Sequence, residues 1–362
     1  MSNVSSDNSG IHVSRINRLL AAFEDRGIDT LLVTSPSNRR YLSGFTGSSA
    51  NLLIAGERRL LITDGRYPTQ AAAEAADYEL VIHSGPLLDQ VAASALDIGA
   101  ARMGFDPGLT TVADFEALSK LLEPECELVG VSGLVEELRL LKDEAEMEAL
   151  RRAIAIGDAA MEVAEKSVRP GVREIEVAIA IEREFRLAGA SGPSFPVIVA
   201  SGRNAAMPHH SPTGKEIEAG DSVVIDMGAK LDGYCSDMTR TFCVGGPTPM
   251  FEKIYGIVLE AQQAAIDGVR DGMSAKDCDG LARDVISEAG YGDKFGHGTG
   301  HGVGLDIHES PRVSFASNDV LQAGMVHSVE PGIYLPQWGG VRIEDLVLVT
   351  EDGSETLSQY PK

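Results

Sequence analysis

Cysteine is scarce in this chain, and the few cysteines are scattered. Cys126, Cys235, Cys243 and Cys278 are the only four among 362 residues, and no two have CxxC spacing. A disulfide framework and a thiolate zinc site both need regularly spaced cysteines, so both are disfavoured. Such sparse use of cysteine suits a reducing cytoplasm.

Long apolar runs are also missing. No stretch approaches the roughly 18 apolar residues that identify a membrane-spanning helix. Residues 1–10 are polar and lack the basic and apolar regions of a secretory signal. We therefore expect a cytoplasmic protein with no membrane partner, and a disordered tail over residues 1–10.

Basic residues are outnumbered by acidic ones. The chain has 31 lysines and arginines against 54 aspartates and glutamates, for a formal net charge of -23. Binding to nucleic acid or to an anionic membrane normally requires a basic patch, so both partner classes are disfavoured. A solvated acidic surface explains the excess, with cation binding by some of the acids as the alternative.

The length predicts two domains, because a single core rarely grows past about 250–300 residues. In residues 11–132, short strand-like runs alternate with helical patterns, which indicates an α/β domain with a partly parallel sheet. In residues 133–362, long helical patterns precede a glycine-rich, strand-like stretch, and this grouping indicates an α+β domain. The boundary lies just before a charged helical segment that begins near Leu134.

Two acids lie on a predicted hairpin in the segment VVIDMGAKLDGYCSDMTRTF. If the turn centres between Leu231 and Asp232, Asp226 and Asp237 face each other directly across the strands. Like charges in that position are destabilising, and a divalent cation held by both would compensate. A bulge at Gly233 could shift the register by one residue, and two solvated surface acids are the alternative.

The segment GHGTGHGVGLDIHE contains three of the eight histidines, His297, His301 and His308. Imidazole is the commonest metal ligand in proteins and a natural acid or base near neutral pH. The glycines disfavour a helix, so this is not a helical HExxH site. A flexible loop rich in glycine and histidine is the alternative.

Glu330 and Glu344 each lie in a strongly apolar, strand-like stretch near the end of the sequence. A buried carboxylate needs a partner or a metal ion. The local alternative pairs Glu344 with Arg342 and leaves Glu330 at the end of a strand before Pro331.

Together these segments provide four carboxylates and an imidazole, and therefore four negative charges. Two divalent cations would balance them, whereas one would leave two buried charges uncompensated at several kcal/mol each. Ligation by oxygen and nitrogen without thiolate suits Mn²⁺, Co²⁺ or Zn²⁺. Two such ions activate a water and polarise a carbonyl, which indicates hydrolysis.

These motifs, with EPGIY and VRIED, resemble the pita-bread metallopeptidases over nearly the whole chain after the tail. The resemblance implies a pita-bread catalytic domain and five metal ligands, Asp226, Asp237, His301, Glu330 and Glu344. The stretch RYLSGFTGSSANLLI is similar to small bacterial Xaa-Pro aminopeptidases, and it implies a creatinase/prolidase-like N-terminal domain.

The resemblance also implies roles for other side chains. His209 would contact the substrate and stabilise the transition state, with its neighbour His210 as the weaker candidate. His297 and His308 match histidines that hold the carbonyl and proline side of the substrate.

Glu330 matches the carboxylate that orients and deprotonates a water. Tyr334 and Arg342 match residues of the substrate pocket, Arg342 with a catalytic role. Thr239 could donate a hydrogen bond to the carboxylate of a metal ligand.

The resemblance implies an Xaa-Pro aminopeptidase, which acts on peptides with proline at the second position. It also implies two divalent metal ions, first of all Mn²⁺, and a homodimer. An Xaa-Pro dipeptidase is the close alternative, and it would need a cation to capture the free carboxylate of the dipeptide. Arg39 and Arg40 are candidates for that cation. A non-catalytic binding protein on the same fold is disfavoured because all five ligand positions are filled.

Overall fold

The computed structural model describes residues 8–362, which form two compact units, residues 8–139 and 140–362. Residues 1–7 of the predicted tail lie outside the described part, while residues 8–10 belong to the first helix. The units divide between Arg139 and Leu140, later than the predicted boundary. The reason is that Leu134, Val135 and Arg139 are buried, and Arg139 donates a hydrogen bond to Asn38 of the first unit (2.8 Å).

The first unit is a mixed six-stranded sheet with helices. Its helices are α1 (Asn8–Ala21), α2 (Phe23–Arg26), α3 (Pro36–Ser43), α4 (Pro68–Glu74), α5 (Leu87–Asp97), α6 (Val112–Leu122) and α7 (Leu134–Arg139). Its strands are β1 (Thr30–Val33), β2 (Ala50–Ala55), β3 (Arg58–Asp64), β4 (Glu79–His83), β5 (Arg102–Phe105) and β6 (Glu127–Gly130).

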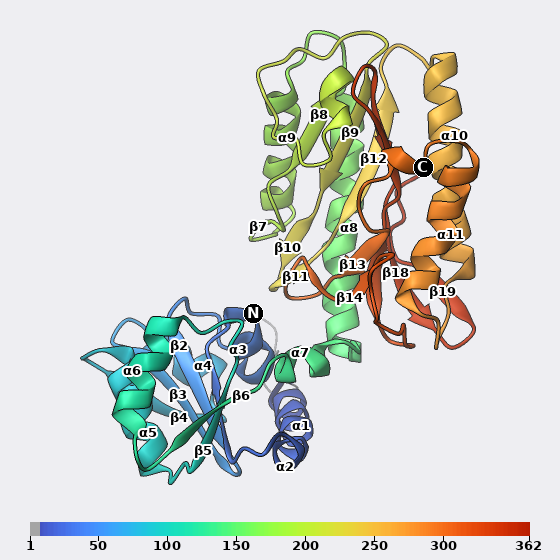
Figure 1. Ribbon diagram of the computed structural model, residues 1–362. Helices are drawn as coiled ribbons and strands as arrows, with labels where there is room; N and C mark the ends of the chain where they lie inside the picture. The colour runs from blue at the N-terminus through green and yellow to red at the C-terminus, as the bar shows by residue number, and fades with distance from the viewer. Residues whose placement is uncertain (1–7) are drawn as a thin grey trace. The chain divides into compact units, whose positions relative to one another are not determined.

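The sheet order is β4-β3-β2-β1-β5-β6 (Figure 1). The pairs β3–β4, β1–β5 and β5–β6 are parallel, and the pairs β1–β2 and β2–β3 are antiparallel. The predicted, partly parallel α/β sheet is therefore present. Strand β5 contains Gly104, and glycine weakens a strand signal in sequence. A Cβ at this position would lie 2.8 Å from Cδ1 of Ile28, so that side chain would have to shift to accommodate it.

The second unit surrounds several small antiparallel sheets with four long helices. The helices are α8 (Glu144–Ser167), α9 (Glu174–Leu187), α10 (Pro249–Gly268) and α11 (Ala275–Glu288), with short 3₁₀ turns at Gly202–Ala206 (η1) and Gly292–Lys294 (η2). The earlier strands are β7 (Gly192–Pro193), β8 (Ile198–Ser201), β9 (Ser222–Met227), β10 (Ala229–Leu231), β11 (Tyr234–Cys235) and β12 (Met238–Cys243). The later strands are β13 (Gly300–Gly302), β14 (Glu309–Val313), β15 (Val326–Val329), β16 (Gly332–Leu335), β17 (Gly339–Arg342), β18 (Asp345–Thr350) and β19 (Gly353–Thr356).

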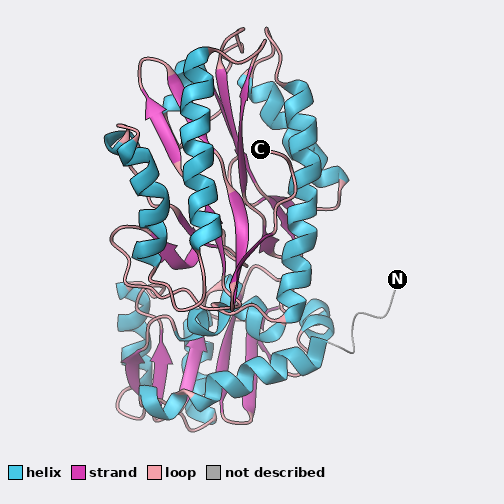
Figure 2. Cartoon of the chain, turned by 90° about the vertical axis from the view of Figure 1, so that its right-hand side faces the viewer, coloured by secondary structure: helices cyan, strands magenta, loops and turns pink. Residues whose placement is uncertain are grey.

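The two helix pairs bury separate cores. Helices α8 and α9 pack on β9 and β12 around residues such as Phe185, Ile225 and Met238. Helices α10 and α11 pack on the later strands around residues such as Ile254 and Val347. Figures 1 and 2 show the strands lying between these two groups of helices. Within the described residues, no helix is both long and apolar enough to span a bilayer.

The charged segment that begins near Leu134 contains two helices, α7 and α8. Helix α7 ends at Arg139, and α8 begins after Asp143, whose side chain accepts a hydrogen bond from the backbone N–H of Glu146 (2.9 Å). The Glu146 side chain in turn accepts from the Asp143 N–H, so a capping box starts the second helix.

The hairpin that carries the two aspartates has a different register from the predicted one. Asp232 and Gly233 have φ values of 47° and 82°, so they form a two-residue turn with positive φ at both positions, as Asp-Gly favours. Asp226 consequently pairs with Thr239. Asp237 lies two residues along the strand from that pair, diagonally across from Asp226 on the same face, and this distance of about 7–8 Å leaves room for an ion between the carboxylates.

Candidate metal centre and active site

The four predicted acidic ligands share one origin, which is their position next to core residues. Ile225 and Met238 pack into the core of α8 and α9, so their neighbours Asp226 and Asp237 point to the opposite face. Val329 and Ile343 pack into the core of α10 and α11, and the residues that follow them are Glu330 and Glu344. The acids therefore meet between two cores that their apolar neighbours build.

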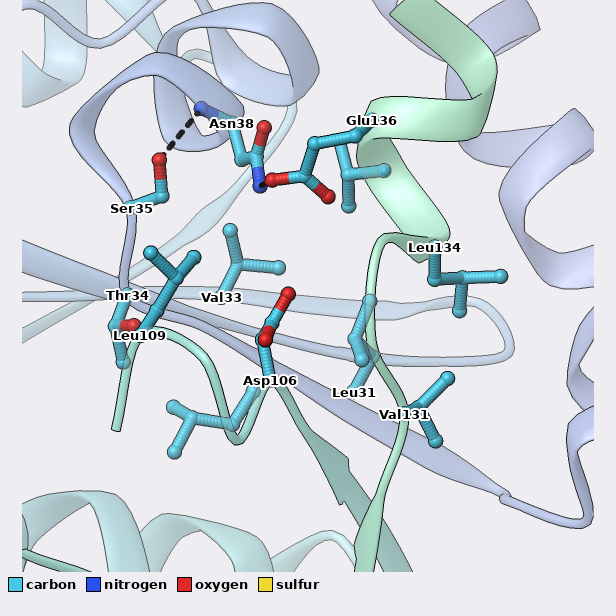
Figure 3. Close-up of a pocket in the computed structure, with 12 residues that line it drawn as sticks. Leu31, Val33, Thr34, Ser35, Asn38, Asp106, Leu109, Val131, Leu134 and Glu136 are labelled. Atoms are coloured by element: carbon cyan, nitrogen blue, oxygen red, sulfur yellow. Dashed lines mark hydrogen bonds between the residues drawn. The ribbon is translucent and has the colours of Figure 1, made fainter. Parts of the chain in front are cut away.

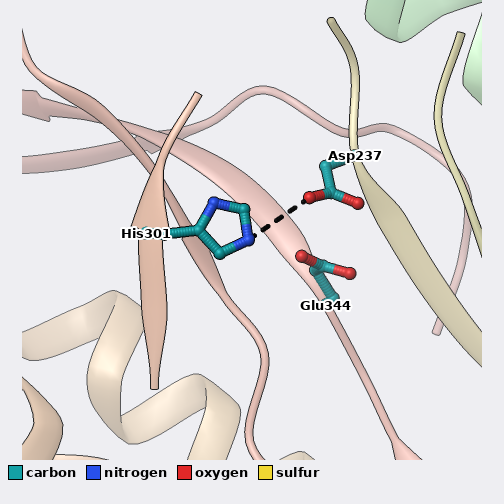
Figure 4. Close-up of side chains that lie close together, drawn as sticks. All are labelled: Asp237, His301 and Glu344. Carbon is teal, nitrogen blue, oxygen red and sulfur yellow. Dashed lines mark ion pairs between the residues drawn. The ribbon is translucent and has the colours of Figure 1, made fainter. Parts of the chain in front are cut away.

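Three of the predicted ligands form a compact group (Figure 4). Asp237, His301 and Glu344 each offer a ligand atom, and these atoms all lie within 4.8 Å of one another. Asp237 and Glu344 are buried, and the His301 Nε2 lies 3.6 Å from a carboxylate oxygen of Asp237. One imidazole and two carboxylates in such a volume are a donor set for a divalent cation.

The other two predicted ligands border this group. Glu330 Oε1 lies 3.3 Å from His301 Nε2 and accepts a hydrogen bond from the Ser328 hydroxyl. Asp226 Oδ2 accepts a hydrogen bond from Arg342 at 2.6 Å. Its second oxygen, Oδ1, is buried and has no hydrogen-bond partner among the described residues. A buried carboxylate oxygen without a partner is costly, and a cation would remove that cost.

Burial and mutual repulsion disturb the ionisation of these acids. Burial raises the pKa of Asp237 and Glu344 well above the usual range, and the charges of neighbouring carboxylates, including Glu330 and Asp226, raise both further. Burial also raises the pKa of Asp226, although Arg342 opposes the shift. Burial acts on Glu330 in the same direction, but the hydrogen bond and charge of His301 lower its pKa to about 2. The residues therefore fit a cation site.

Arg342 donates hydrogen bonds to three side chains of this centre. Its guanidinium donates to Asp226, to the Thr239 hydroxyl (3.1 Å) and to the Tyr334 hydroxyl (3.0 Å). The ion pair of Arg342 is with Asp226, so the local pairing of Arg342 with Glu344 that the sequence left open is wrong. The Thr239 hydroxyl donates to Glu344 Oε2 (2.7 Å), which confirms the predicted support of a ligand carboxylate.

The predicted substrate histidines gather near the same centre. His297 Nε2 lies 2.8 Å from the Tyr334 hydroxyl, and the ring of His308 lies 4.4 Å from that of His301. Burial lowers the pKa of both His297 and His308, and the nearby charge of His209 contributes to each shift. His209 and His308 are exposed and His297 is half-buried, so all three have some access to solvent.

The side chain of His210 contacts Glu174. Its Nε2 lies 3.0 Å from a carboxylate oxygen of Glu174, which is fully buried at the start of α9. The same carboxylate accepts hydrogen bonds from Ser201, Asn204 and Thr213. Glu174 therefore ties down both ends of the segment that carries His209. Sequence reasoning missed it, although a glutamate at the first position of an amphipathic helix was a usable signal.

We expect Glu174 to stabilise the protein in a pH-dependent way. Burial raises its pKa, but the hydrogen bonds from Asn204, His210, Thr213 and Ser201 lower it to about 2. The unfolded chain takes up this proton near the usual value and the folded chain only near pH 2. The stabilisation of about 3 kcal/mol is therefore complete above pH 4.5 and lost as the pH falls towards 2.

Denaturant unfolding between pH 2 and pH 7, with a chelator present throughout, measures this effect. Glu174→Gln should lose about 3 kcal/mol at pH 7 and little more on acidification. Glu182→Gln, an exposed position on the same helix, should follow the wild type. An unchanged unfolding free energy for Glu174→Gln at pH 7 would contradict the role assigned to this carboxylate.

The first unit contains a separate hollow of about 300 Å³ that includes open solvent, at the carboxyl ends of β1, β5 and β6 (Figure 3). Asp106 faces it, but its two oxygens accept hydrogen bonds from the N–H groups of Gly108 and Gly133. Asn38 is likewise bonded to Glu136 and Arg139. Asp106 and Asn38 at this hollow therefore already have partners within the first unit.

Arg39, one of the two arginines considered for capture of a substrate carboxylate, is buried in the first unit. Its guanidinium donates to the backbone carbonyls of Gly47 (2.8 Å) and Ala50 (2.7 Å). Only Arg40, which is half-buried, remains a candidate for binding the carboxylate of the substrate.

Comparison with known proteins agrees with this description. The profile of metallopeptidase family M24 matches residues 148–351, and the profile of the creatinase/prolidase N-terminal domain matches residues 15–141. The chain therefore belongs to metallopeptidase family M24. The predicted fold class, an α+β pita-bread domain after a smaller α/β domain, is confirmed.

Individual relatives cover nearly the whole chain. It is 37% identical over 347 residues to the Xaa-Pro dipeptidase of Pyrococcus furiosus, spanning 95% of this chain and 97% of that protein. The solved structure of an Xaa-Pro dipeptidase from Bacillus anthracis has a TM-score of 0.94 and 45% identity, covering 97% and 98% of the two chains. That of an X-Pro aminopeptidase from Thermotoga maritima has a TM-score of 0.88 and 36% identity, covering 94% and 98%.

Proposed function

We propose that this protein is an Xaa-Pro aminopeptidase, which hydrolyses the bond between an N-terminal residue and a following proline. The observation that carries the proposal is the group of Asp237, His301 and Glu344 next to Glu330 and Asp226, in a chain of metallopeptidase family M24. The specificity for proline is supported by the names of the relatives, which are Xaa-Pro dipeptidases and an X-Pro aminopeptidase.

The five ligands would hold two divalent metal ions, first of all Mn²⁺, with Co²⁺ and Zn²⁺ as alternatives. Such ions supply an acidified water and a polarised carbonyl when bound. Charge matching no longer chooses between one ion and two, because the buried Arg342 reduces the net charge of the ligand cluster from four negative charges to three. The proposal of two ions is therefore supported by the number of ligand side chains and by the family resemblance.

The surrounding side chains have separate tasks in this proposal. Glu330 lies beside His301, where it can accept a proton from a water. His209, His297 and His308 are placed to contact the peptide carbonyl and the proline ring. Arg342 uses its donors on Asp226, Thr239 and Tyr334, so it acts by holding the carboxylate and the hydroxyl in place. Tyr334 then presents its hydroxyl to His297.

Location and assembly complete the proposal. We propose a cytoplasmic homodimer, supported by the sparse use of cysteine and by the family resemblance.

An Xaa-Pro dipeptidase is the second candidate, and the name of the 45% identical protein from Bacillus anthracis favours it. That activity needs a cation to bind the free carboxylate after proline. The burial of Arg39 against backbone carbonyls removes one of the two N-terminal candidates for that cation. This supports a site that accepts longer peptides.

A peptide panel separates the two candidates. The purified protein, supplied with manganese, cobalt or zinc in turn, is assayed on Xaa-Pro and Xaa-Pro-Yaa, with Xaa-Ala-Yaa as the control. We expect release of the N-terminal residue from Xaa-Pro-Yaa and little cleavage of the alanine peptide. Hydrolysis of the dipeptide alone would refute the aminopeptidase and establish the dipeptidase, and equal cleavage of the alanine peptide would refute proline specificity.

A further inference from the structure

Helix α11 carries a buried ion pair, formed by Asp279 and Arg283 one helical turn apart. Arg283 Nε donates to Asp279 Oδ2 (2.7 Å) and Nη2 donates to Oδ1 (2.9 Å), so the contact is bidentate. Asp279 is 1% exposed. A buried ion pair pays a desolvation cost and is stable only with further hydrogen bonds, so its remaining partners show what it holds.

Arg283 lies 5.1 Å from the centre of the Phe315 ring, but the hydrogen-bond partners of the pair all belong to one segment, which begins at Phe295. Arg283 donates to the backbone carbonyls of Phe295 (3.0 Å) and His297 (2.7 Å), and its guanidinium lies 4.2 Å from the centre of the Phe295 ring. Asp279 Oδ1 accepts hydrogen bonds from the N–H (3.0 Å) and the hydroxyl (2.9 Å) of Thr299. The pair therefore holds three alternate residues, with His297 in the middle.

The held segment leads directly into the metal centre. The His297 ring reaches the Tyr334 hydroxyl, which accepts a hydrogen bond from Arg342. The carbonyl of Thr299 accepts the N–H of Glu330 (2.8 Å). His301 follows Thr299 by two residues. The backbone that the pair ties down therefore places a substrate histidine on one side and two metal ligands on the other.

Comparison with another i,i+4 pair separates this arrangement from ordinary helix stabilisation. Glu162 and Lys166 on α8 are exposed, and within the described residues neither makes a hydrogen bond or ion pair with a third residue, as expected of a pair that contributes little. The Asp279–Arg283 pair instead directs two guanidinium donors and one carboxylate oxygen at backbone groups and a hydroxyl outside its helix.

We infer that Asp279 and Arg283 are positioning residues of the peptidase, which act on substrate binding through His297. The inference rests on the proposed function, because it assigns the substrate to the side of the site where His297 lies. Within the described residues, the pair makes no hydrogen bond to the side chain of a proposed metal ligand. Its loss should displace His297 while leaving metal binding intact, and a displacement of about 1 Å is enough to cost about 10²-fold in rate.

The test is a double-mutant cycle on the metal-loaded protein, with kcat/KM for an Xaa-Pro-Yaa peptide as the readout. Arg283→Met should lower kcat/KM by about 10- to 100-fold with unchanged metal content by elemental analysis. In a His297→Ala background the same substitution should cost less than about twofold, because its route to the substrate is already gone. Equal losses in both backgrounds would overturn the inference, since a general structural defect multiplies.

A matched control and a second variant keep the test decisive. Arg151 makes a bidentate pair with Glu355 in the same unit, and neither residue contacts the His297 segment, so Arg151→Met should leave kcat/KM within about twofold. If Arg283→Met fails to fold, Asp279→Asn is used in the same cycle. That change keeps the shape of the side chain but removes its charge.

Failure of the inference differs from failure of the proposed function. Wild-type protein that cleaves no Xaa-Pro peptide under any metal refutes the function. In that case amide hydrogen exchange still tests the pair: exchange at Thr299 and Glu330 should accelerate in Arg283→Met and not in Arg151→Met. Unchanged exchange at both amides would overturn the positioning role itself.

Discussion

Replacing Asp237 by asparagine is expected to abolish peptide hydrolysis and, at the same time, to stabilise the metal-free protein. Asparagine keeps the shape of the side chain but removes one charge from the group with His301 and Glu344. Loss of a metal ligand should lower kcat by at least about 10³-fold, which corresponds to several kcal/mol of lost transition-state stabilisation.

The gain in stability follows from electrostatics. Burial and the charges of Glu344, Asp226 and Glu330 raise the pKa of Asp237 well above its usual range. Without metal, an ionised Asp237 is therefore unfavourable at pH 7, and its removal should increase the free energy of unfolding by about 1–3 kcal/mol. A loss of activity together with a gain in stability is expected of a site whose acids bind a cation.

The matched control lies on the same hairpin. Asp232 is exposed at the turn, where it pairs with Arg152, and its φ of 47° is one that asparagine tolerates. Asp232→Asn should leave both activity and stability near the wild-type values. Activity measurements and denaturant unfolding in the presence of a chelator decide the matter. Retained turnover in Asp237→Asn would refute its assignment as a ligand.

Removal of divalent metal should destabilise the second unit selectively. All five proposed ligands lie within residues 140–362, and none lies in the first unit. A ligand that binds only the folded state stabilises it by about 3–4 kcal/mol at 100 to 1,000 times its dissociation constant. Chelation should therefore abolish hydrolysis and lower the unfolding temperature of this unit by several degrees, and manganese should restore both.

Amide hydrogen exchange locates the effect of the metal. Protection should fall in residues 222–243 and 326–345, which carry the acidic ligands, when chelator is added. The sheet of the first unit, residues 30–64, provides the internal control and should not change. Exchange that is identical with and without chelator throughout the second unit would contradict the metal site.

Local chemistry explains why so much of this protein was predictable. The alternation of strand-like runs and helical patterns in residues 11–132 predicted a partly parallel α/β sheet, and the structure has it. Side chains alternate between the two faces of a strand, so Asp226 and Asp237 point away from the core that their neighbours enter. That the two aspartates share a face could therefore be predicted from the sequence. The register was not, because it depends on which two residues adopt positive φ, and Asp232 with Gly233 form the turn in place of Leu231 with Asp232.

Contacts between distant residues could not be obtained in the same way. Arg342 meets Asp226 across 116 positions of the chain, and Glu174 meets His210 across 36, and no local pattern encodes either pair. The burial of Arg342 beside Asp226 reduced the net negative charge of the centre from four to three. Arg39 likewise changed from a candidate for substrate binding into a buried brace of its own unit.

The sequence by itself determined the reactive groups of this protein: the acids and histidines, their order, and the apolar neighbours that bury them. These follow from residue type and from short-range periodicity, which the chain carries locally. Only the tertiary structure decided how those groups are paired and held, from the diagonal placement of the two aspartates to the Asp279–Arg283 pair behind His297. These contacts join segments that are far apart in the sequence, so no local pattern encodes them. They form only when both cores of the second unit have packed.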